Sequence, residues 1–301
     1  MLELRNPKTA VPVVLFAGII WSFGPLVVRY MDDPQLIPWQ YIFGRGLTIF
    51  ILLNLYLYFE EGKNFYKNYF KMGLSGLIGG SGLGVAMISF MFSITNTSAA
   101  ITLLCLAAMP FFAALLAFLF LNEKISLNVW ISIFIATIGI GIMAVGNNAD
   151  TSLVGFAFGI TSSLGFAVFS VTLRWRKETP KFTTTAFAGL FCFIFATIMI
   201  FKDDLVFFSS SYNSSLFSLH GTLVCLGLIL YSIGSKAIPA AELTLLSLTE
   251  VIGGIFWVWL PLFGINEIPA TNTIIGGFFL FISLTYYSLI MRWNKRYIGL
   301  N

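Results

Sequence analysis

Apolar segments of about 20 residues recur along almost the whole chain, and this repetition constrains the fold more than any other feature. Each segment is long enough to cross a hydrocarbon core about 30 Å thick as an α-helix. The longest connections, near residues 59–69 and 202–212, leave no room for a separate soluble domain. We predict ten spans, at approximately residues 10–30, 36–58, 70–93, 97–121, 126–146, 152–173, 182–201, 213–235, 238–262 and 270–291.

The composition agrees with a membrane protein. Only 10% of the 301 residues are charged, whereas an ordinary soluble domain has about 25%. The first apolar stretch is too long for a cleaved signal peptide and no small-residue cleavage site follows it, so we expect it to remain as a membrane helix. Cys105, Cys192 and Cys225 stand singly within apolar runs, without the spacing of a metal motif or a disulfide framework. We therefore expect no bound metal and no cofactor.

The distribution of lysine and arginine predicts the orientation. If the chain starts inside and the ten spans alternate, fourteen basic residues fall on inside segments, and only Arg29 and Lys202 fall outside. Basic residues accumulate in cytoplasmic loops of membrane proteins. We expect a multi-pass protein of the plasma (inner) membrane with both termini cytoplasmic. The same distribution accounts for the net charge of +4 without a nucleic-acid partner.

A weak internal repeat relates the two halves of the chain. The segment TSAAITLLCLAAM is similar to IPAAELTLLSLTE, so that their Ala-Ala pairs align at a shift of 141 residues, and the same shift places Ser22 on Ser163. Five spans per half is an odd number, so the second half enters the membrane from the opposite side. We predict an all-α membrane protein with ten transmembrane helices, arranged as two inverted five-helix repeats at residues 1–148 and 149–301.

Several of these segments resemble a known family. The stretch SAAITLLCLAAMPFFAALLAFLFLNEKIS, followed by a Gly-rich span, resembles the EamA-type repeat of the drug/metabolite transporter superfamily. LTEVIGGIFWVWL resembles the second copy of that repeat, although Val251 stands after Glu250 where members often have proline. WSFGPLVVR and PWQYIFGRG are similar to the opening of such proteins. The resemblance covers essentially the whole chain and implies ten helices and solute transport, often the export of a metabolite or an amino acid.

Inverted repeats are typical of secondary transporters that bind substrate at the membrane midplane. An ionised arginine at that depth costs at least about 2.5 kcal/mol, so Arg45 in the second span should face a cavity or a partner. It can bind a carboxylate or phosphate through two parallel hydrogen bonds. Alternatively, it forms an ion pair with Glu250 that ties the halves together.

Glu250 lies at a similar depth in the ninth span. Its carboxyl group can bind a cationic group, exchange a proton as the cavity opens to each side, or serve as a hydrogen-bonded structural acid. We expect Glu250 and His220, the only histidine, to be the candidates for proton coupling. A hydrogen bond from His220 to a neighbouring helix is the alternative. With helical neighbours of Glu250 included, the substrate-binding candidates are Trp21, Ser22, Arg45, Ser247, Glu250 and Trp257.

Two spans carry proline near the centre. Gly24–Pro25 should bend the first span and Pro110 the fourth, because proline removes a backbone donor and crowds the preceding turn. Ser22 and a freed carbonyl group can then face a cavity that Trp21 walls. A static kink that serves only packing is the alternative.

We therefore predict a secondary active transporter that exports a small metabolite such as an amino acid by alternating access, as a monomer or homodimer in the lipid bilayer, with the proton as a candidate coupling ion. Uptake of a cationic or quaternary-amine solute is the alternative, since aromatic walls suit a cation. A passive channel and an intramembrane enzyme are further alternatives. The enzyme has no motif to support it, because HExxH and GxSxG are both missing from the sequence and no catalytic residues can be named.

Overall fold

The computed structural model describes residues 6–97, 99–145, 152–176, 178–265 and 271–298, and all regular secondary structure in these ranges is helical. The predicted boundary between residues 148 and 149 lies outside the described residues. Two short 3-10 turns occur at Gly62–Asn64 and Pro261–Phe263. The α-helices are α1 (Pro7–Trp21), α2 (Gly24–Arg29), α3 (Pro38–Glu61), α4 (Lys67–Lys71), α5 (Gly73–Asn96), α6 (Ala99–Leu106), α7 (Met109–Leu121), α8 (Leu127–Val145), α9 (Leu153–Trp175), α10 (Lys181–Lys202), α11 (Ser211–Gly234), α12 (Ala240–Ser247), α13 (Thr249–Trp259) and α14 (Thr271–Ile298).

Eight segments of the described chain are long and apolar enough to cross a membrane, which makes this a multi-pass membrane protein. They coincide with the first four predicted spans and with the sixth to ninth. The predicted fifth and tenth spans coincide with α8 and α14, whose apolar stretches, Leu127–Gly139 and Ile274–Tyr287, are shorter. The all-helical fold class is confirmed for the described residues, and the number of ten crossings stays a prediction.

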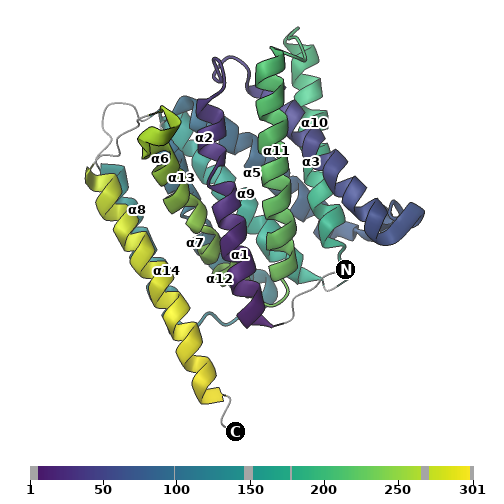
Figure 1. Ribbon diagram of the computed structural model, residues 1–301. Coiled ribbons are helices and arrows are strands. Elements are labelled where there is room, and N and C mark those ends of the chain that lie inside the picture. The colour runs from purple at the N-terminus through teal and green to yellow at the C-terminus, as the bar shows by residue number, and fades with distance from the viewer. Residues whose placement is uncertain (1–5, 98, 146–151, 177, 266–270, 299–301) are drawn as a thin grey trace.

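The helices pack as one bundle with a paired edge (Figure 1). At its centre α5 packs against α9 and α10, while α3 packs against α10 and α11, and α11 packs in turn against α1. Helices α8 and α14 lie together along one edge. Helix α1 begins and α14 ends at the same end of the bundle, at the bottom of Figure 1.

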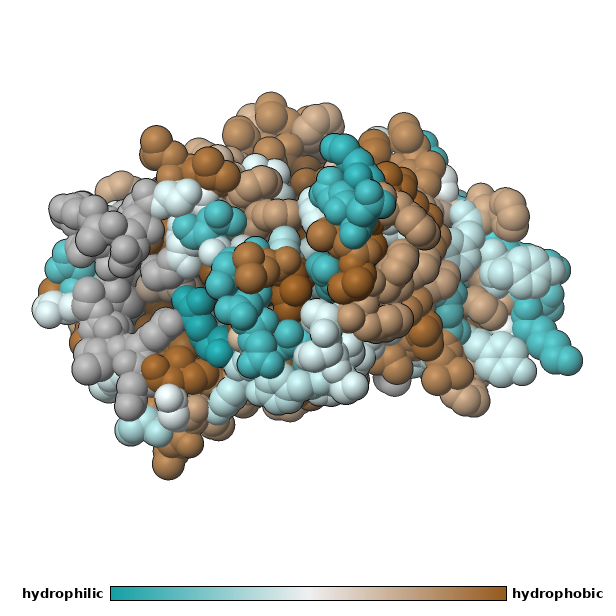
Figure 2. Space-filling view, turned by 90° about the horizontal axis from the view of Figure 1, so that it is seen from above, coloured by the Kyte–Doolittle hydropathy of each residue, from teal (hydrophilic) through white to brown (hydrophobic). Residues whose placement is uncertain are grey.

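The outer surface is apolar, as a lipid-facing surface must be. Figure 2, which looks down on the end of the bundle that is uppermost in Figure 1, shows hydrophobic side chains around much of the periphery and hydrophilic ones gathered nearer the middle. Large apolar side chains point outward from several helices, among them Phe16, Phe118, Phe134, Phe201 and Phe278. In the membrane, lipid tails cover these rings.

Two of the membrane-crossing segments are interrupted where a proline follows. The first segment breaks at Ser22–Phe23, between α1 and α2, and the fourth at Ala107–Ala108, between α6 and α7. Pro25 and Pro110 stand in the first turn of the helix that follows each break. A missing backbone donor costs nothing there, because the first N–H groups of a helix have no partner within it.

The ninth segment is also interrupted, at Leu248 between α12 and α13, and no proline causes this break. The backbone N–H groups of Leu248 and Val251 each donate to a carbonyl three residues earlier, at 3.2 and 3.0 Å, which tightens the turn. The Thr249 hydroxyl donates to the carbonyl of Leu15 at 3.3 Å and thereby fixes the turn against α1.

The close crossing of α9 over α5 gives a stability prediction. A Cβ atom at Gly165 would lie 2.5 Å from the Gly82 carbonyl oxygen and 3.0 Å from the backbone nitrogen of Ala86, and neither atom can move cheaply. We expect Gly165→Ala to lower the free energy of unfolding by about 1–3 kcal/mol through overpacking, measured as thermal unfolding in detergent. Gly141→Ala is the matched control, because nothing lies within 4 Å of its added methyl group. Equal melting temperatures for both variants would contradict the packing described here.

Candidate functional site

A cavity of about 70 Å³ lies among the central helices and borders all three helix breaks. Trp21 precedes the first break, Leu106 and Met109 flank the second, and Glu250 follows the third. The walls of the cavity come from α1, α3, α5, α6, α7, α9, α11 and α13. The lining residues are Trp21, Arg45, Leu83, Ala86, Met87, Phe90, Leu106, Met109, Ser162, Phe166, His220, Val224, Leu228 and Glu250.

Arg45 is held in one orientation on the wall of this cavity. Its side chain is buried, and Nη1 donates to the Tyr41 hydroxyl while Nη2 donates to the Met87 carbonyl, both at 2.8 Å. The Tyr41 oxygen in turn lies 2.7 Å from Nδ1 of His220 on α11. Three helices therefore fix the guanidinium group, and the charge is compensated by dipoles rather than by a carboxylate.

Glu250 faces the same cavity from α13. Within the described part of the chain, the hydrogen bonds of Arg45 go to Tyr41 and Met87, and its guanidinium forms no ion pair with Glu250. The sequence left a direct Arg45–Glu250 pair open as an alternative to substrate binding. In this structure the two groups share a cavity without touching.

The aromatic candidates take different positions. Trp21 lines the cavity, donates from Nε1 to the Val224 carbonyl at 3.2 Å, and lies against Gly227, where a Cβ atom would be 2.1 Å from that nitrogen. Trp257 instead donates to the Ser22 hydroxyl oxygen at 2.7 Å, outside the cavity lining. The indole of Trp257 therefore connects α13 to the break in the first segment.

Two further candidates serve local structure in this conformation. Ser22 also donates to the Ile19 carbonyl at 2.6 Å, and Ser247 donates to the Thr244 carbonyl at 2.8 Å, so each hydroxyl is satisfied within its own helix region. Neither serine lines the cavity. Their predicted contact with substrate, like the hinge role of the two prolines, stays a prediction.

Gly24 has a specific neighbour that the sequence did not reveal. A Cβ atom at this position would lie 2.7 Å from Nε2 of His220. The absence of a side chain at the start of α2 therefore leaves room for the imidazole ring. This contact places His220 between the first helix break and Tyr41.

Sequence reasoning missed most of the remaining lining residues, although one signal was available. The shift of 141 residues that relates the two halves makes Met109 the counterpart of Glu250, although it carries no charge. The structure brings Met109 and Glu250 to the same cavity. Applying the repeat shift to each candidate would have indicated further lining positions.

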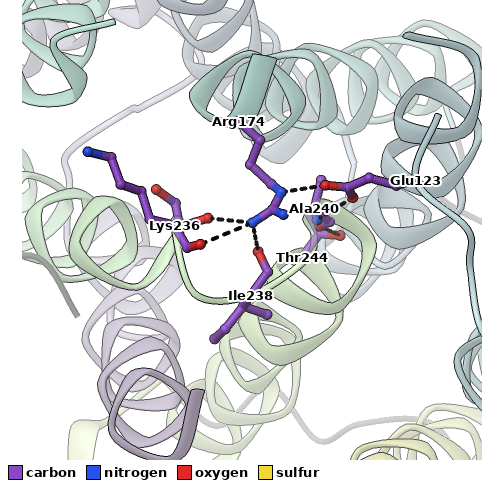
Figure 3. Close-up of polar contacts among 7 residues, drawn as sticks. Glu123, Arg174, Lys236, Ile238, Ala240 and Thr244 are labelled. Atoms are coloured by element: carbon purple, nitrogen blue, oxygen red, sulfur yellow. Dashed lines mark hydrogen bonds and ion pairs between the residues drawn. The ribbon is translucent and has the colours of Figure 1, made fainter. Parts of the chain in front are cut away.

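A second polar cluster ties several helices together at one end of the bundle (Figure 3). Arg174, near the end of α9, donates from Nε to Glu123 at 2.6 Å. Its Nη1 also donates to main-chain carbonyl groups of Ser235, Lys236 and Ile238, at 3.1, 3.4 and 2.7 Å. In the sequence, Arg174 is only one of the fourteen basic residues predicted to lie inside.

The position of this cluster has an electrostatic reason. The last carbonyl groups of α11 have no partners within the helix and carry the negative end of its dipole. Lys181 adds a second cation there, because its Nζ donates to the Ser232 carbonyl at 3.2 Å and to the Ser235 hydroxyl at 2.7 Å. Glu123 accepts in turn from the backbone nitrogen of Ala240 at the start of α12, at 3.4 Å. The cluster thus joins the end of α7 to α9, α11 and α12.

The apolar helical bundle, with an arginine and a glutamate on its central cavity, is that of a multi-pass membrane protein. Residues 8–145 match the EamA-like transporter family, which confirms the resemblance over that part of the sequence. Two proteins of Helicobacter pylori, both described as uncharacterized transporters, are similar to this chain. The protein of strain J99 is 26% identical and that of strain 26695 is 25% identical, each over 170 residues.

These matches span 56% of this chain and 56% of each relative. A solved crystal structure has the same fold, with a TM-score of 0.71 at 15% sequence identity, over 95% of this chain and 98% of that one. The family and the relatives point to a transporter rather than to an enzyme, as expected from the sequence. No group of three or more metal-ligating side chains is present among the described residues.

The Arg174 cluster gives a second prediction. We expect Glu123→Gln to lower the free energy of unfolding by about 1 kcal/mol, because a partly exposed ion pair becomes a hydrogen bond between a cation and a neutral amide. Glu178→Gln is the matched control, since Glu178 is exposed at the same end of the bundle. Thermal unfolding in detergent measures both. A loss in the control equal to that in Glu123→Gln would show that surface charge, and not the cluster, sets the stability.

Proposed function

We propose that this protein is a secondary active transporter that exports a small zwitterionic metabolite, such as an amino acid, by alternating access. The observation that carries the proposal is the central cavity, where a fixed guanidinium and a carboxyl group meet at three interrupted helices. Interrupted helices at the midplane are a common way to build substrate sites in transporters. The direction of transport rests on the family resemblance.

We further propose two inverted five-helix repeats, and the cavity lining supports them. Four pairs of lining residues are related by the shift of 141 positions found in the sequence. The pairs are Trp21 and Ser162, Leu83 and Val224, Met87 and Leu228, and Met109 and Glu250. A pseudo-two-fold axis through the cavity accounts for this pairing, because equivalent positions then meet at the same place from opposite sides.

The backbone supports the same arrangement. The break between α6 and α7 recurs at the corresponding place between α12 and α13. Asn122 and Gly264, which are 142 positions apart, both adopt positive φ, at 53° and 70°. Pairs of packed helices also match between the two halves. When the membrane segments are counted in chain order and each is replaced by the segment five places away, the pair α5–α9 becomes α11–α1, and the pair α5–α10 becomes α11–α3.

The site chemistry fits a zwitterion. Arg45 would bind the carboxylate, Glu250 the ammonium group or a coupling proton, and Trp21 the apolar part of the solute. Because no ion pair joins Arg45 to Glu250, neither charge has to be released before the solute binds. The Arg174 cluster would close the cytoplasmic end while the solute occupies the cavity.

The proposed orientation, with both termini cytoplasmic in the inner membrane, gives a third prediction. Lys63 and Asp204 are equivalent at the shift of 141 but should lie on opposite sides. In intact cells we expect a membrane-impermeant maleimide to label Asp204→Cys and not Lys63→Cys, with both labelled after permeabilisation. The unmodified chain is the control, since its three cysteines are buried. Labelling of both sites, or of Lys63→Cys alone, in intact cells would refute the inverted topology.

A panel of amino acids and related solutes gives the fourth prediction and tests the function itself. We expect one or more zwitterions to raise the melting temperature of the purified protein and to exchange across proteoliposomes with saturable counterflow, which a passive channel does not show. Arg45→Gln and Glu250→Gln should each weaken binding about 10-fold or more, as expected when a charged hydrogen bond is lost. Ligand stabilisation that survives both substitutions unchanged would reject the proposed site.

Uptake of a cationic or quaternary-amine solute is a second candidate function. It is favoured by the rings of Trp21, Phe90 and Phe166, which line the cavity together with Glu250, since aromatic faces attract cations. Choline in the same panel separates the two candidates. A choline response that needs Glu250 but not Arg45 would favour the cation.

A further inference from the structure

The hydrogen bonds around Tyr41 have only one direction that satisfies every buried group. A guanidinium group donates only, so the Tyr41 oxygen accepts from Arg45 Nη1 at 2.8 Å. The Tyr41 side chain is fully buried. Among the described residues, Nδ1 of His220 at 2.7 Å is the acceptor within reach of its O–H group. An Nδ1–H tautomer would leave the hydroxyl proton without an acceptor, which is costly in a buried site.

It follows that Nδ1 of His220 accepts a hydrogen bond and carries no proton. The single proton of a neutral imidazole is then on Nε2. His220 is buried, with 3% of its surface exposed, and it lines the cavity. No described residue accepts a hydrogen bond from Nε2, and Gly24 lies against that nitrogen without a side chain to cover it. A donor without a partner among the described residues thus remains on a side chain that lines the cavity.

We infer that Tyr41 and His220 are positioning and recognition residues for an anionic group: Tyr41 orients the Arg45 guanidinium and locks His220 as the Nε2–H tautomer, whose free donor binds the same solute group as Arg45. This inference rests on the proposed function for the identity of the solute. It assigns His220 to binding rather than to proton transfer, and any coupling proton then falls to Glu250. Two donors on one wall fit a carboxylate, which has two acceptor oxygen atoms.

The titratable and charged groups around the ring are few. Tyr41 and Arg45 approach from α3, Glu250 faces the shared cavity from α13, and Cys192 of α10 packs near Arg45, where its sulfur contacts Met87. The Tyr41 hydroxyl lies between the Arg45 guanidinium and the imidazole ring. Protonation of Nδ1 would turn that hydrogen bond into a contact between two donors.

Because His220 is the only histidine, its protonation state can be read directly, and this is our fifth prediction. Nitrogen NMR of the purified full-length chain, labelled with ¹⁵N-histidine, should show a protonated Nε2 and an unprotonated Nδ1, unchanged between about pH 5.5 and 8.5, the range in which an ordinary histidine titrates. Tyr41→Phe should abolish this single state and give a tautomer mixture or a titrating ring. A wild-type ring protonated at Nδ1, or a Tyr41→Phe spectrum equal to that of the wild type, would overturn the inference.

Tyr231→Phe is the matched control. It also removes the hydroxyl group of a fully buried tyrosine, but that group bonds to Ser170 at 2.6 Å and does not line the cavity. The His220 spectrum should not change in this variant. If Tyr41→Phe does not fold, the wild-type tautomer alone decides the question.

A binding measurement tests recognition separately from the identity of the transported solute. Acetate, as a bare carboxylate, should shift the Nε2 resonance of the wild-type protein, whereas methylammonium should not. His220→Gln retains a donor near the position of Nε2, whereas the shorter amide of His220→Asn lies near the position of Nδ1 and offers no donor at that of Nε2. We expect His220→Asn to weaken acetate binding about 10-fold and His220→Gln to weaken it less. No shift with acetate would overturn the recognition role, while failure of the amino-acid panel alone would leave the tautomer result standing.

Discussion

A cation buried at the centre of an apolar bundle must find its compensation within the protein, and the centre of this structure is organised around that constraint. Taking a charged group out of water costs several kcal/mol unless hydrogen bonds replace the lost solvation. For Arg45 these bonds come from Tyr41 on its own helix and from the Met87 carbonyl on α5. The carbonyl is available although it belongs to a helix, because each carbonyl oxygen has a second lone pair. The guanidinium group thus stays charged without a carboxylate partner.

This mode of compensation also explains how the cavity can hold a guanidinium and a carboxyl group that are not paired with each other. If Arg45 were neutralised by Glu250, a solute would have to compete with a preformed ion pair. Because main-chain and hydroxyl dipoles support the guanidinium instead, Glu250 stays separate. The glycines at 24 and 227 serve the same centre, since they leave space for the rings of His220 and Trp21.

The sequence predicted the helical class and the positions of the membrane-crossing segments because hydropathy acts locally, over about 20 residues at a time. It also indicated Trp21, Arg45, His220 and Glu250, since polar or aromatic groups within an apolar helix stand out by themselves. It could not separate these residues from Ser22 and Ser247, because a hydroxyl that bonds back to its own helix has the same sequence signature as one that faces a cavity. The break at Leu248 was missed because a tight turn, rather than a proline, produces it.

The sequence could not have predicted that Arg174 holds a polar cluster together, because the partners of Arg174 are mostly main-chain atoms that carry no sequence signal. That choice of partner also has a mechanical consequence. Carbonyl groups cannot change rotamer, so these hydrogen bonds depend on where the connection between α11 and α12 lies relative to α9. Any movement that separates this connection from α9 breaks several hydrogen bonds in the same step, so a partly separated state is not stabilised. A contact of this kind favours two discrete positions of the helices over a continuous range.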